Sequence, residues 1–367
     1  MSVIALVLGI SLLSLAVIDY ARSPADHKGI YIGDLFLPLG PQGPSAAGQK
    51  PSPNPRGHPP TPVRTPGGST ATGLSRCWAY TQAGTTTQGI SRKAGALAAS
   101  PCTGVSWVFH WRDLEPAPGQ YRWTLVDAAI ASTSKPVFLR VVAGIQSPDW
   151  VRSAALTISI PATSLTPAGW MPVPWDRRFL NQWEAFIAAF GARYDRNARI
   201  ALIEVAGNGI YGESYLPGGL VLWQSVGYTQ AGYIAAIKEV VNKYVAAFPH
   251  RFIGLGVSSG VVGANQNPMS QLVAWEAQVY PSKVYVQQNG LSAATVQGRQ
   301  SVQRGARFGF QMVGPTNQSR TGNLCTAFRI ALAERASYVE VYFSDATNPA
   351  WYPALRYLMS GNSAAHC

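Results

Sequence analysis

The sequence is short of charge, and above all of acidic charge. Charged residues make up 13% of the 367 residues, and 17 acidic residues stand against 29 basic ones, which gives a net charge of +12. Such a surplus favours acidic polymers or anionic surfaces as partners. The sequence contains no run of five or more Lys or Arg residues and no nucleic-acid-binding motif. We therefore expect no nucleic-acid partner.

Cysteine is also scarce: the chain has only Cys77, Cys102, Cys325 and Cys367. They form no Cys-x-x-Cys pair, and no histidine lies at zinc-like spacing, so we expect no metal and no cofactor. An even number of cysteines behind an apolar leader is typical of disulfides in an oxidising compartment. Of the three pairings, Cys77–Cys102 with Cys325–Cys367 is favoured, because each bond would join a domain end to a nearby segment. Four buried free thiols are the alternative.

Two catalytic fingerprints are absent. No Gly-x-Gly-x-x-Gly follows the first expected strand, so the chain lacks the signature of dinucleotide-binding folds. The pair Ser258-Ser259 lacks the Gly-x-Ser-x-Gly elbow, which argues against a serine hydrolase.

The N-terminus carries an uninterrupted apolar run, "VIALVLGISLLSLAVI", at residues 3–18. Its length is near the upper end for the core of a signal peptide and just short of a usual membrane-spanning helix. We interpret residues 1–25 as an export signal or a signal-anchor, and the terminal position disfavours a core helix. The protein is therefore expected to be secreted or held at the cell surface, with membrane association through residues 3–18 if the leader is kept.

Residues 39–75 are dominated by Pro, Gly, Ser and Thr. A segment of this composition cannot bury enough apolar surface to fold, and its prolines keep it extended. We interpret residues 26–75 as a linker and residues 76–367 as one folded domain. Most of the positive surplus belongs to that domain, because only five of the 29 basic residues precede it.

The domain alternates strand-like and helix-like segments. The clearest helical segment is 229–248, where five apolar side chains share one face. Alternation over about 290 residues predicts a parallel sheet, and eight units of this length predict an α/β fold of the (β/α)8 barrel class. A doubly wound sheet is the alternative. The expected strands are 76–82, 104–111, 136–144, 200–207, 251–259, 283–290, 307–314 and 337–345, and the other expected helices are 179–194, 270–280 and 323–335.

In such a barrel, functional residues stand at the C-terminal ends of the strands. Here those ends are rich in carboxylates, amides and aromatic residues and poor in lysine and clustered histidine. Amides and carboxylates hydrogen-bond to sugar hydroxyls, and Trp and Tyr rings stack on sugar faces. Two carboxyl groups beside a glycosidic bond suffice for its hydrolysis. The strand ends therefore indicate a carbohydrate site.

The stretch after the second expected strand carries a family resemblance. Residues 111–127 follow the pattern Trp-x-x-Leu-Glu-Pro-x-Pro-Gly-x-Tyr-x-Trp-x-x-x-Asp, and residues 147–151 read Ser-Pro-Asp-Trp-Val. These segments resemble the second- and third-strand regions of clan A glycoside hydrolases, notably the β-galactosidase-like families. The resemblance spans about residues 104–215. It implies a (β/α)8 barrel that cleaves glycosidic bonds with two carboxyl groups.

In that clan, a Glu preceded by Asn after the fourth strand is the general acid/base, and a Glu ending the seventh strand is the nucleophile. The chain departs from both patterns, because Asn208 is not followed by Glu and Gln311 ends the seventh expected strand. Glu213, in the sequence Gly-Ile-Tyr-Gly-Glu, is the acid/base candidate. Glu340, on the eighth expected strand, is the candidate nucleophile or second carboxylate.

We therefore expect a glycoside hydrolase that acts on an extracellular oligo- or polysaccharide. The alternative is a catalytically degenerate barrel that binds glycan or serves as a structural surface protein. The missing Asn-Glu pair and the basic charge, which suits an acidic carbohydrate, favour this alternative. The residues expected to position the sugar are Trp111, Arg112, Arg140, Trp150, Asn208, Tyr211, Gln288, Asn289, Gln311 and Trp351.

Some of these residues have structural interpretations as well. Arg140 lies inside an apolar strand and is expected to pair with Glu204 or Glu340, because an unpaired buried arginine is costly. Each tryptophan expected at the sugar could instead pack in the core. Glu115 could belong to the site or could shape its loop by accepting backbone N–H bonds.

Overall fold

The computed structural model describes residues 29–32, 35–38, 74–162, 167–258, 260–261, 269–294 and 307–361. The chain divides into two units, residues 1–63 and residues 64–367. In the first unit, β1 (Gly29–Ile32) pairs antiparallel with β2 (Leu35–Pro38), inside the range expected to be linker. Residues 3–18 lie outside the described part. None of the described helices combines the length and apolar character that crossing a bilayer requires.

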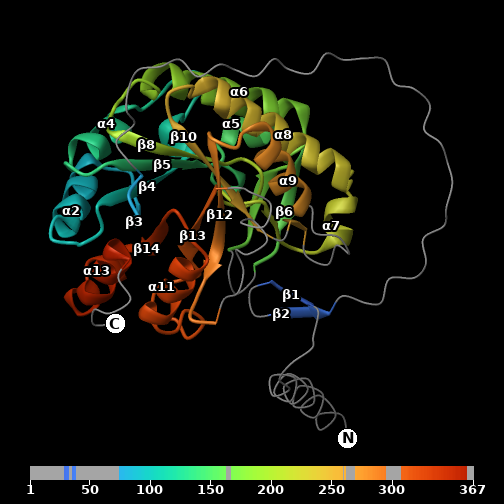
Figure 1. Cartoon of the computed structure of the whole chain (residues 1–367). Helices are drawn as coiled ribbons and strands as arrows, with labels where there is room; N and C mark the ends of the chain where they lie inside the picture. Colours follow the sequence, from blue (N-terminus) through green and yellow to red (C-terminus); the bar gives the residue numbers. More distant parts are fainter. Residues whose placement is uncertain are drawn as a thin grey trace, which may run out of the picture. The chain divides into compact units, whose positions relative to one another are not determined.

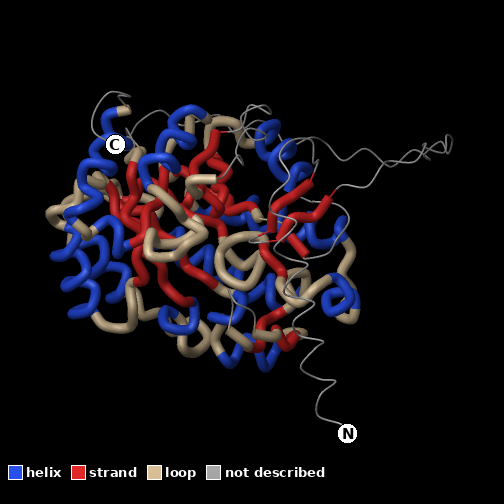
Figure 2. Tube along the Cα trace, turned by 90° about the horizontal axis from the view of Figure 1, so that it is seen from below, coloured by secondary structure: helices blue, strands red, loops and turns tan. Residues whose placement is uncertain are grey.

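The second unit is built around a closed barrel of eight parallel strands, surrounded by helices (Figures 1 and 2). The expected (β/α)8 barrel is confirmed, and each of the eight expected strand segments supplies one barrel strand. Each strand pairs with the next barrel strand along the chain, and the last pairs with the first. The barrel strands are β3 (Cys77–Gln82), β4 (Gly104–His110), β5 (Val137–Val142), β8 (Ile200–Val205), β10 (Phe252–Val257), β12 (Val284–Leu291), β13 (Arg307–Met312) and β14 (Val339–Tyr342).

The helices cover the outside of the barrel (Figure 2). In α8, the buried side chains include all five that the sequence pattern places on one face. Side chains cap the helix starts: Thr229 accepts a hydrogen bond from Gly232 N, and Asp176 accepts one from Phe179 N. The main helices are α2 (Thr87–Leu97), α4 (Thr124–Ala131), α6 (Arg177–Tyr194), α8 (Gln230–Ala247), α9 (Met269–Val279), α11 (Leu324–Ala333) and α13 (Tyr352–Ser360).

Shorter helices and strands lie in the loops that follow the barrel strands. Two small sheets are formed there, an antiparallel pair of β6 with β7 and a parallel pair of β9 with β11. The short elements are α3 (Trp111–Leu114), the 3-10 turn Gly144–Gln146, α5 (Asp149–Ala154), β6 (Thr157–Ile160), β7 (Gly169–Pro172), β9 (Tyr215–Leu216), α7 (Leu220–Gln224), β11 (Gly260–Val261), α12 (Phe343–Ala346) and the 3-10 turn Pro349–Trp351.

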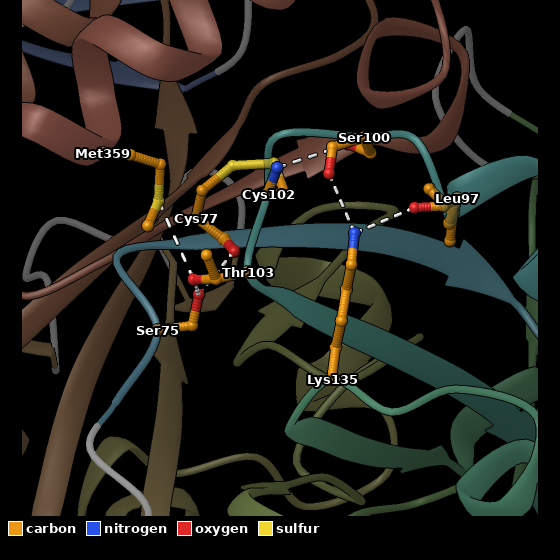
Figure 3. The surroundings of a disulfide bond; sticks show 8 residues. All are labelled: Ser75, Cys77, Leu97, Ser100, Cys102, Thr103, Lys135 and Met359. Atoms are coloured by element: carbon orange, nitrogen blue, oxygen red, sulfur yellow. Dashed lines mark hydrogen bonds between the residues drawn. A yellow bond between two sulfur atoms is a disulfide. The ribbon is translucent and has the colours of Figure 1, made fainter.

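A disulfide joins Cys77 and Cys102, the first of the two pairs favoured from the sequence (Figure 3). Cys77 begins β3, and Cys102 lies just before β4, so the bond ties together the N-terminal ends of two neighbouring strands. Beside it, the Ser75 and Thr103 hydroxyl oxygens lie 2.6 Å apart. These contacts stabilise the end of the barrel opposite to the one where active sites form.

The second expected pair is Cys325 with Cys367. Cys325 is disulfide-bonded as well. Cys367 lies outside the described residues, so this pairing stays a prediction.

Glu276 is an exception to the apolar packing of the helix layer. Its side chain on α9 is completely buried, and neither carboxyl oxygen accepts a hydrogen bond from the described residues. Burial raises the pKa of Glu276 to about 8. The folded chain therefore holds this carboxyl group protonated at neutral pH, whereas the unfolded chain does not.

We expect Glu276→Gln to stabilise the protein, and more so at high pH. Below about pH 4.5 the carboxyl group of Glu276 is protonated in both the folded and the unfolded chain. As pH rises from about 4.5 toward 8, the unfolded chain releases the proton while the folded chain keeps it, so the free energy of unfolding of the wild type falls. At pH 8 the free energy of unfolding should increase by about 4 kcal/mol, and at pH 5 by under about 1 kcal/mol. Urea unfolding measures both. The control Glu239→Gln, at a partly exposed ion pair with Arg177, should change little, and equal stability of wild type and Glu276→Gln at both pH values would contradict this expectation.

Candidate active site

Five barrel strands repeat one pattern inside the barrel: an apolar or aromatic residue and, two positions later, a polar one. Side chains two positions apart share a face of a strand. The barrel interior therefore has an aromatic layer and, nearer the C-terminal ends of the strands, a polar layer. The aromatic layer contains Trp78, Phe138, Leu202, Tyr285 and Tyr338. The polar layer contains Tyr80, Arg140, Glu204, Gln287 and Glu340.

The aromatic layer forms a closely packed floor beneath the polar one. The rings of Trp78 and Phe138 are 5.8 Å apart, and those of Phe138 and Tyr338 are 6.1 Å apart. Gly309 makes room for Tyr338, because a Cβ at residue 309 would lie 2.4 Å from that ring. The Arg140 guanidinium carbon lies 5.6 Å from the centre of the Phe138 ring. The polar layer therefore rests on apolar surface.

Arg140 joins two carboxylates across the barrel. Its Nη2 donates to Glu340 Oε2 at 2.9 Å and also to Glu204 Oε2, to which Nε donates as well. Arg140 is 4% exposed, and both glutamates are 0% exposed. Burial, the largest single effect, would lower the pKa of Arg140, but Glu340, Tyr80 and Glu213 together raise it above its usual value. The sequence-based expectation that Arg140 pairs with Glu204 or Glu340 is confirmed for both.

Gln287 extends this network to two further residues. Its Nε2 donates to Asn289 Oδ1 at 2.9 Å and lies 3.4 Å from Glu204 Oε2. Its Oε1 accepts from the Tyr338 hydroxyl at 3.0 Å. The amide is therefore held from both sides, and Asn289, expected at the sugar site, is linked to the Glu204 carboxylate through it.

One oxygen of each buried glutamate has no hydrogen-bond partner among the described residues: Glu204 Oε1 and Glu340 Oε1. The two Oε2 atoms bind the same Arg140 nitrogen. Two acceptors of one nitrogen lie no more than about 6 Å apart, twice a usual hydrogen-bond length. The two carboxyl groups are therefore held close together, each with an oxygen available to a further donor.

Glu213 lies on the loop that follows β8, above this pair. The neighbouring Ser214 fixes the loop, because its N and Oγ both donate to Gly256 O at 3.3 Å. A Cβ at residue 256 would lie 2.9 Å from Glu204 Oε1 and 3.3 Å from Glu213 Cα, so the lack of a side chain lets the loop pass directly over Glu204. In contrast to the two buried glutamates, Glu213 is partly exposed.

Glu213 and Glu340 both affect the pKa of the same two tyrosines, Tyr80 and Tyr342. Tyr80 and Tyr342 are partners in register on β3 and β14, and their rings are 5.2 Å apart. Burial raises the pKa of both hydroxyls, and that of Tyr342 reaches about 12. The charges of Glu213 and Glu340 both contribute to the rise in each case. Both carboxylates therefore lie within electrostatic reach of the same two rings at the C-terminal end of the barrel.

The structure corrects the expectation for Trp111. Its side chain is completely buried, with its ring centre 4.7 Å from that of Trp183 and 5.8 Å from that of Phe186. The physical reason is that α3 begins at Trp111 and turns the ring into the helix layer, against α6. A buried ring presents no face to a sugar, so Trp111 is a packing residue.

Glu115 and Trp150 hold the loop around Trp111. Glu115 accepts hydrogen bonds from Trp111 Nε1 and Gly119 N, both at 2.8 Å, which is the structural interpretation offered for it above. Trp150 is partly buried, and its Nε1 donates to Glu115 O at 3.1 Å. The Trp-x-x-Leu-Glu-Pro pattern therefore builds a loop anchor.

The remaining expected sugar ligands are dispersed. Gln311 is buried and in register with Glu340 on the adjacent strand. Asn208 is buried, its O accepts from the Tyr233 hydroxyl at 2.6 Å, and its Nδ2 has no partner among the described residues. Tyr211 is partly buried, and its pKa is raised by burial and then by Glu213.

Three others lie farther out along the same loops and strands. Gln288 and Trp351 are partly exposed, and Arg112 is exposed. The roles of Arg112 and Trp351 at a sugar stay predictions. In the described part of the chain, no group of three or more His, Cys, Asp or Glu side chains is arranged to hold a metal ion.

Comparisons with known proteins identify no residue of this site. No family model and no curated protein matches the chain. Among solved structures, the chain resembles one described as "Crystal Structure of a glycoside hydrolase", with 10% sequence identity and a TM-score of 0.46. The alignment covers 74% of this chain and 89% of that chain. A likeness at this level assigns no role to any residue.

We expect Arg140→Met to destabilise the protein by about 3–5 kcal/mol, because it leaves two buried carboxylates without their counter-charge. Arg140→Lys keeps the charge and should cost less. The matched control is Arg193→Met, whose ion pair with Asp127 is half exposed and should contribute little to stability. Urea unfolding at pH 7 provides the comparison. If Arg140→Met cost no more than Arg193→Met, the network would not be a determinant of stability.

Proposed function

We propose that the protein is a glycoside hydrolase in which Glu213 and Glu340 act on a glycosidic bond at the C-terminal end of the barrel. One observation carries the proposal: the loop of Glu213 passes over Glu204, and Glu204 shares its Arg140 partner with Glu340. The charges of Glu213 and Glu340 accordingly affect the pKa of the same residues, Tyr80, Tyr342 and Arg140. Carboxyl groups from different strands that converge there are what hydrolysis of a glycoside requires.

In the proposed reaction, Glu213 donates its proton to the glycosidic oxygen as the bond between that oxygen and the anomeric carbon breaks. Partial exposure suits this role, because the proton must be replaced from solvent. Glu340 then either bonds to the anomeric carbon, to be displaced by water, or takes a proton from the attacking water. Water supplies the new hydroxyl group. In the covalent route, the deprotonated Glu213 takes the proton of the water that displaces Glu340, and in the direct route Glu340 releases its proton to solvent while Glu213 takes one up, so that each carboxyl group returns to its starting state.

Arg140 would act as a positioning residue. Its bond to Glu340 Oε2 fixes the carboxylate and leaves Oε1 for the sugar or the water. Retention would need a Glu213–Glu340 separation of about 5–5.5 Å and inversion one of about 6.5–9.5 Å.

A second candidate function is glycan binding without turnover. The observation that favours it is the complete burial of Glu340, since a nucleophile must reach the anomeric carbon. The seventh barrel strand carries Gln311 and not a carboxylate. This also favours binding without turnover, because an amide forms no glycosyl ester. Binding would then use the amides and tyrosines around the Arg140 network.

The two functions differ in what Glu213→Gln does. For hydrolysis, we expect the full chain to release reducing ends from at least one member of a panel of neutral and acidic soluble polysaccharides. Glu213→Gln should lower kcat on that substrate by about 10²–10⁴-fold, because the amide cannot donate the proton. Glycan affinity, measured by affinity electrophoresis, should change little.

Glu239→Gln, on the outer face of α8, is the control for this measurement and should retain full activity. Activity of Glu213→Gln within about threefold of wild type would exclude Glu213 as the proton donor. Binding of a glycan by wild type with no release of reducing ends would instead favour the second candidate.

We also propose that the protein acts outside the cytosol. The Cys77–Cys102 disulfide supports this location, because such bonds persist in oxidising compartments. The location as a secreted or surface protein, through a leader at residues 1–25, stays a prediction.

A further inference from the structure

Arg320 lies on the loop between β13 and α11, which follows a barrel strand and therefore belongs to the C-terminal face. Hydrogen bonds fix this loop on two sides. The Thr316 N and Oγ1 donate to the buried Asp345 carboxylate, and Ala293 N donates to Thr321 O at 3.0 Å. The backbone on either side of Arg320 is therefore anchored to neighbouring elements.

The Arg320 guanidinium has no ion pair with a carboxylate among the described residues. Its Nε donates to Gln318 Oε1 at 2.9 Å, and a Cβ at residue 314 would lie 3.3 Å from that Nε. Between residues 74 and 361, the segments that the structure does not describe (163–166, 259, 262–268 and 295–306) contain no Asp or Glu. A partly buried arginine without a carboxylate keeps its Nη donors for another anion.

Arg320 lies beside the C-terminal end of β14. Its Nε is close to Gly314, two residues beyond the end of β13, and β13 pairs with β14 so that Gln311 is in register with Glu340. Thr316 of the same loop binds Asp345, three residues beyond Tyr342.

Tyr342 is under the influence of Glu213, which raises its pKa, and of Arg320, which lowers it, while burial has the largest effect. A cation and the proposed proton donor therefore act on the same ring. A ligand that reached Glu213 across Tyr342 would bring its substituents close to the guanidinium.

The other acidic groups on this face are already engaged. Asp113 pairs with His110, Asp149 pairs with Arg152, and Asp345 binds Thr316. Glu213 and Glu340 are the carboxylates assigned to the proposed reaction, and the chain as a whole has a net charge of +12. A negatively charged ligand can therefore approach this face without strong repulsion.

We propose that Arg320 binds the carboxylate of an acidic sugar, so that the substrate class is glycans containing uronic acid residues. This inference rests on the proposed carbohydrate site and goes beyond hydrolysis itself. The planar guanidinium matches a carboxylate with two parallel hydrogen bonds, which a neutral hydroxymethyl group cannot reproduce.

The test compares acidic glycans with their carboxyl-reduced counterparts, which differ only in carrying a primary alcohol for each carboxylate. Polygalacturonate, alginate and glucuronoxylan oligosaccharides are the probes, and Kd is measured by calorimetry with the full chain. We expect wild type to bind at least one acidic probe about tenfold or more tighter than its reduced form. Raising the salt concentration should weaken binding of the acidic form alone.

Arg320→Gln should bring the acidic-to-reduced affinity ratio to within about twofold of unity, and Arg320→Lys should keep part of the preference. Arg329→Gln, an exposed arginine on the outer helix α11, is the matched control and should leave the ratio unchanged. Thermal unfolding confirms that each variant is folded.

An unchanged ratio in Arg320→Gln, equal binding of both forms by wild type, or no binding of any acidic probe would each overturn the inference. Failure of hydrolysis is a separate result. If the acidic preference depends on Arg320 but no reducing ends are released, the acidic ligand stands and the hydrolase proposal falls.

Discussion

The ion pairs of Arg140 with Glu204 and Glu340 are the constraint on which the rest of the barrel interior depends. Three charged side chains are buried together, and each would be costly to bury alone. Because the three come from β5, β8 and β14, the network holds strands that are far apart in the sequence in one fixed arrangement. The same arrangement sets the place and orientation of Glu340, on which the proposed chemistry relies.

The surroundings are adapted to this network. Below it, packed aromatic rings exclude water and leave Arg140 no partners other than the polar layer. Above it, Gly256 lets the loop that carries Glu213 pass over Glu204. The Cys77–Cys102 disulfide stabilises the opposite end of the barrel. The disulfide therefore stabilises one end of the barrel, while the charged network contributes both to stability and to the candidate site at the other end.

The sequence predicted the barrel well because eight apolar segments alternate with amphipathic helices, as in α8. It predicted less of the site. Both faces of a barrel strand are buried, so the residue pattern cannot tell which face meets the interior and which meets the helices. The sequence therefore predicts Trp111 at the sugar, although its ring packs against α6. It does not mark Tyr80 or Gln287 as residues of the site. The recurring pairs Phe138/Arg140, Leu202/Glu204 and Tyr338/Glu340 are the signal that marks the interior face.

A crystal structure of the full chain with a bound oligosaccharide tests the central claim most directly. The account predicts a sugar ring beside Tyr342, between the Glu213 and Glu340 carboxyl groups, with those groups separated by about 5–9.5 Å. A separation beyond about 10 Å, or a glycan bound away from both glutamates, would contradict it.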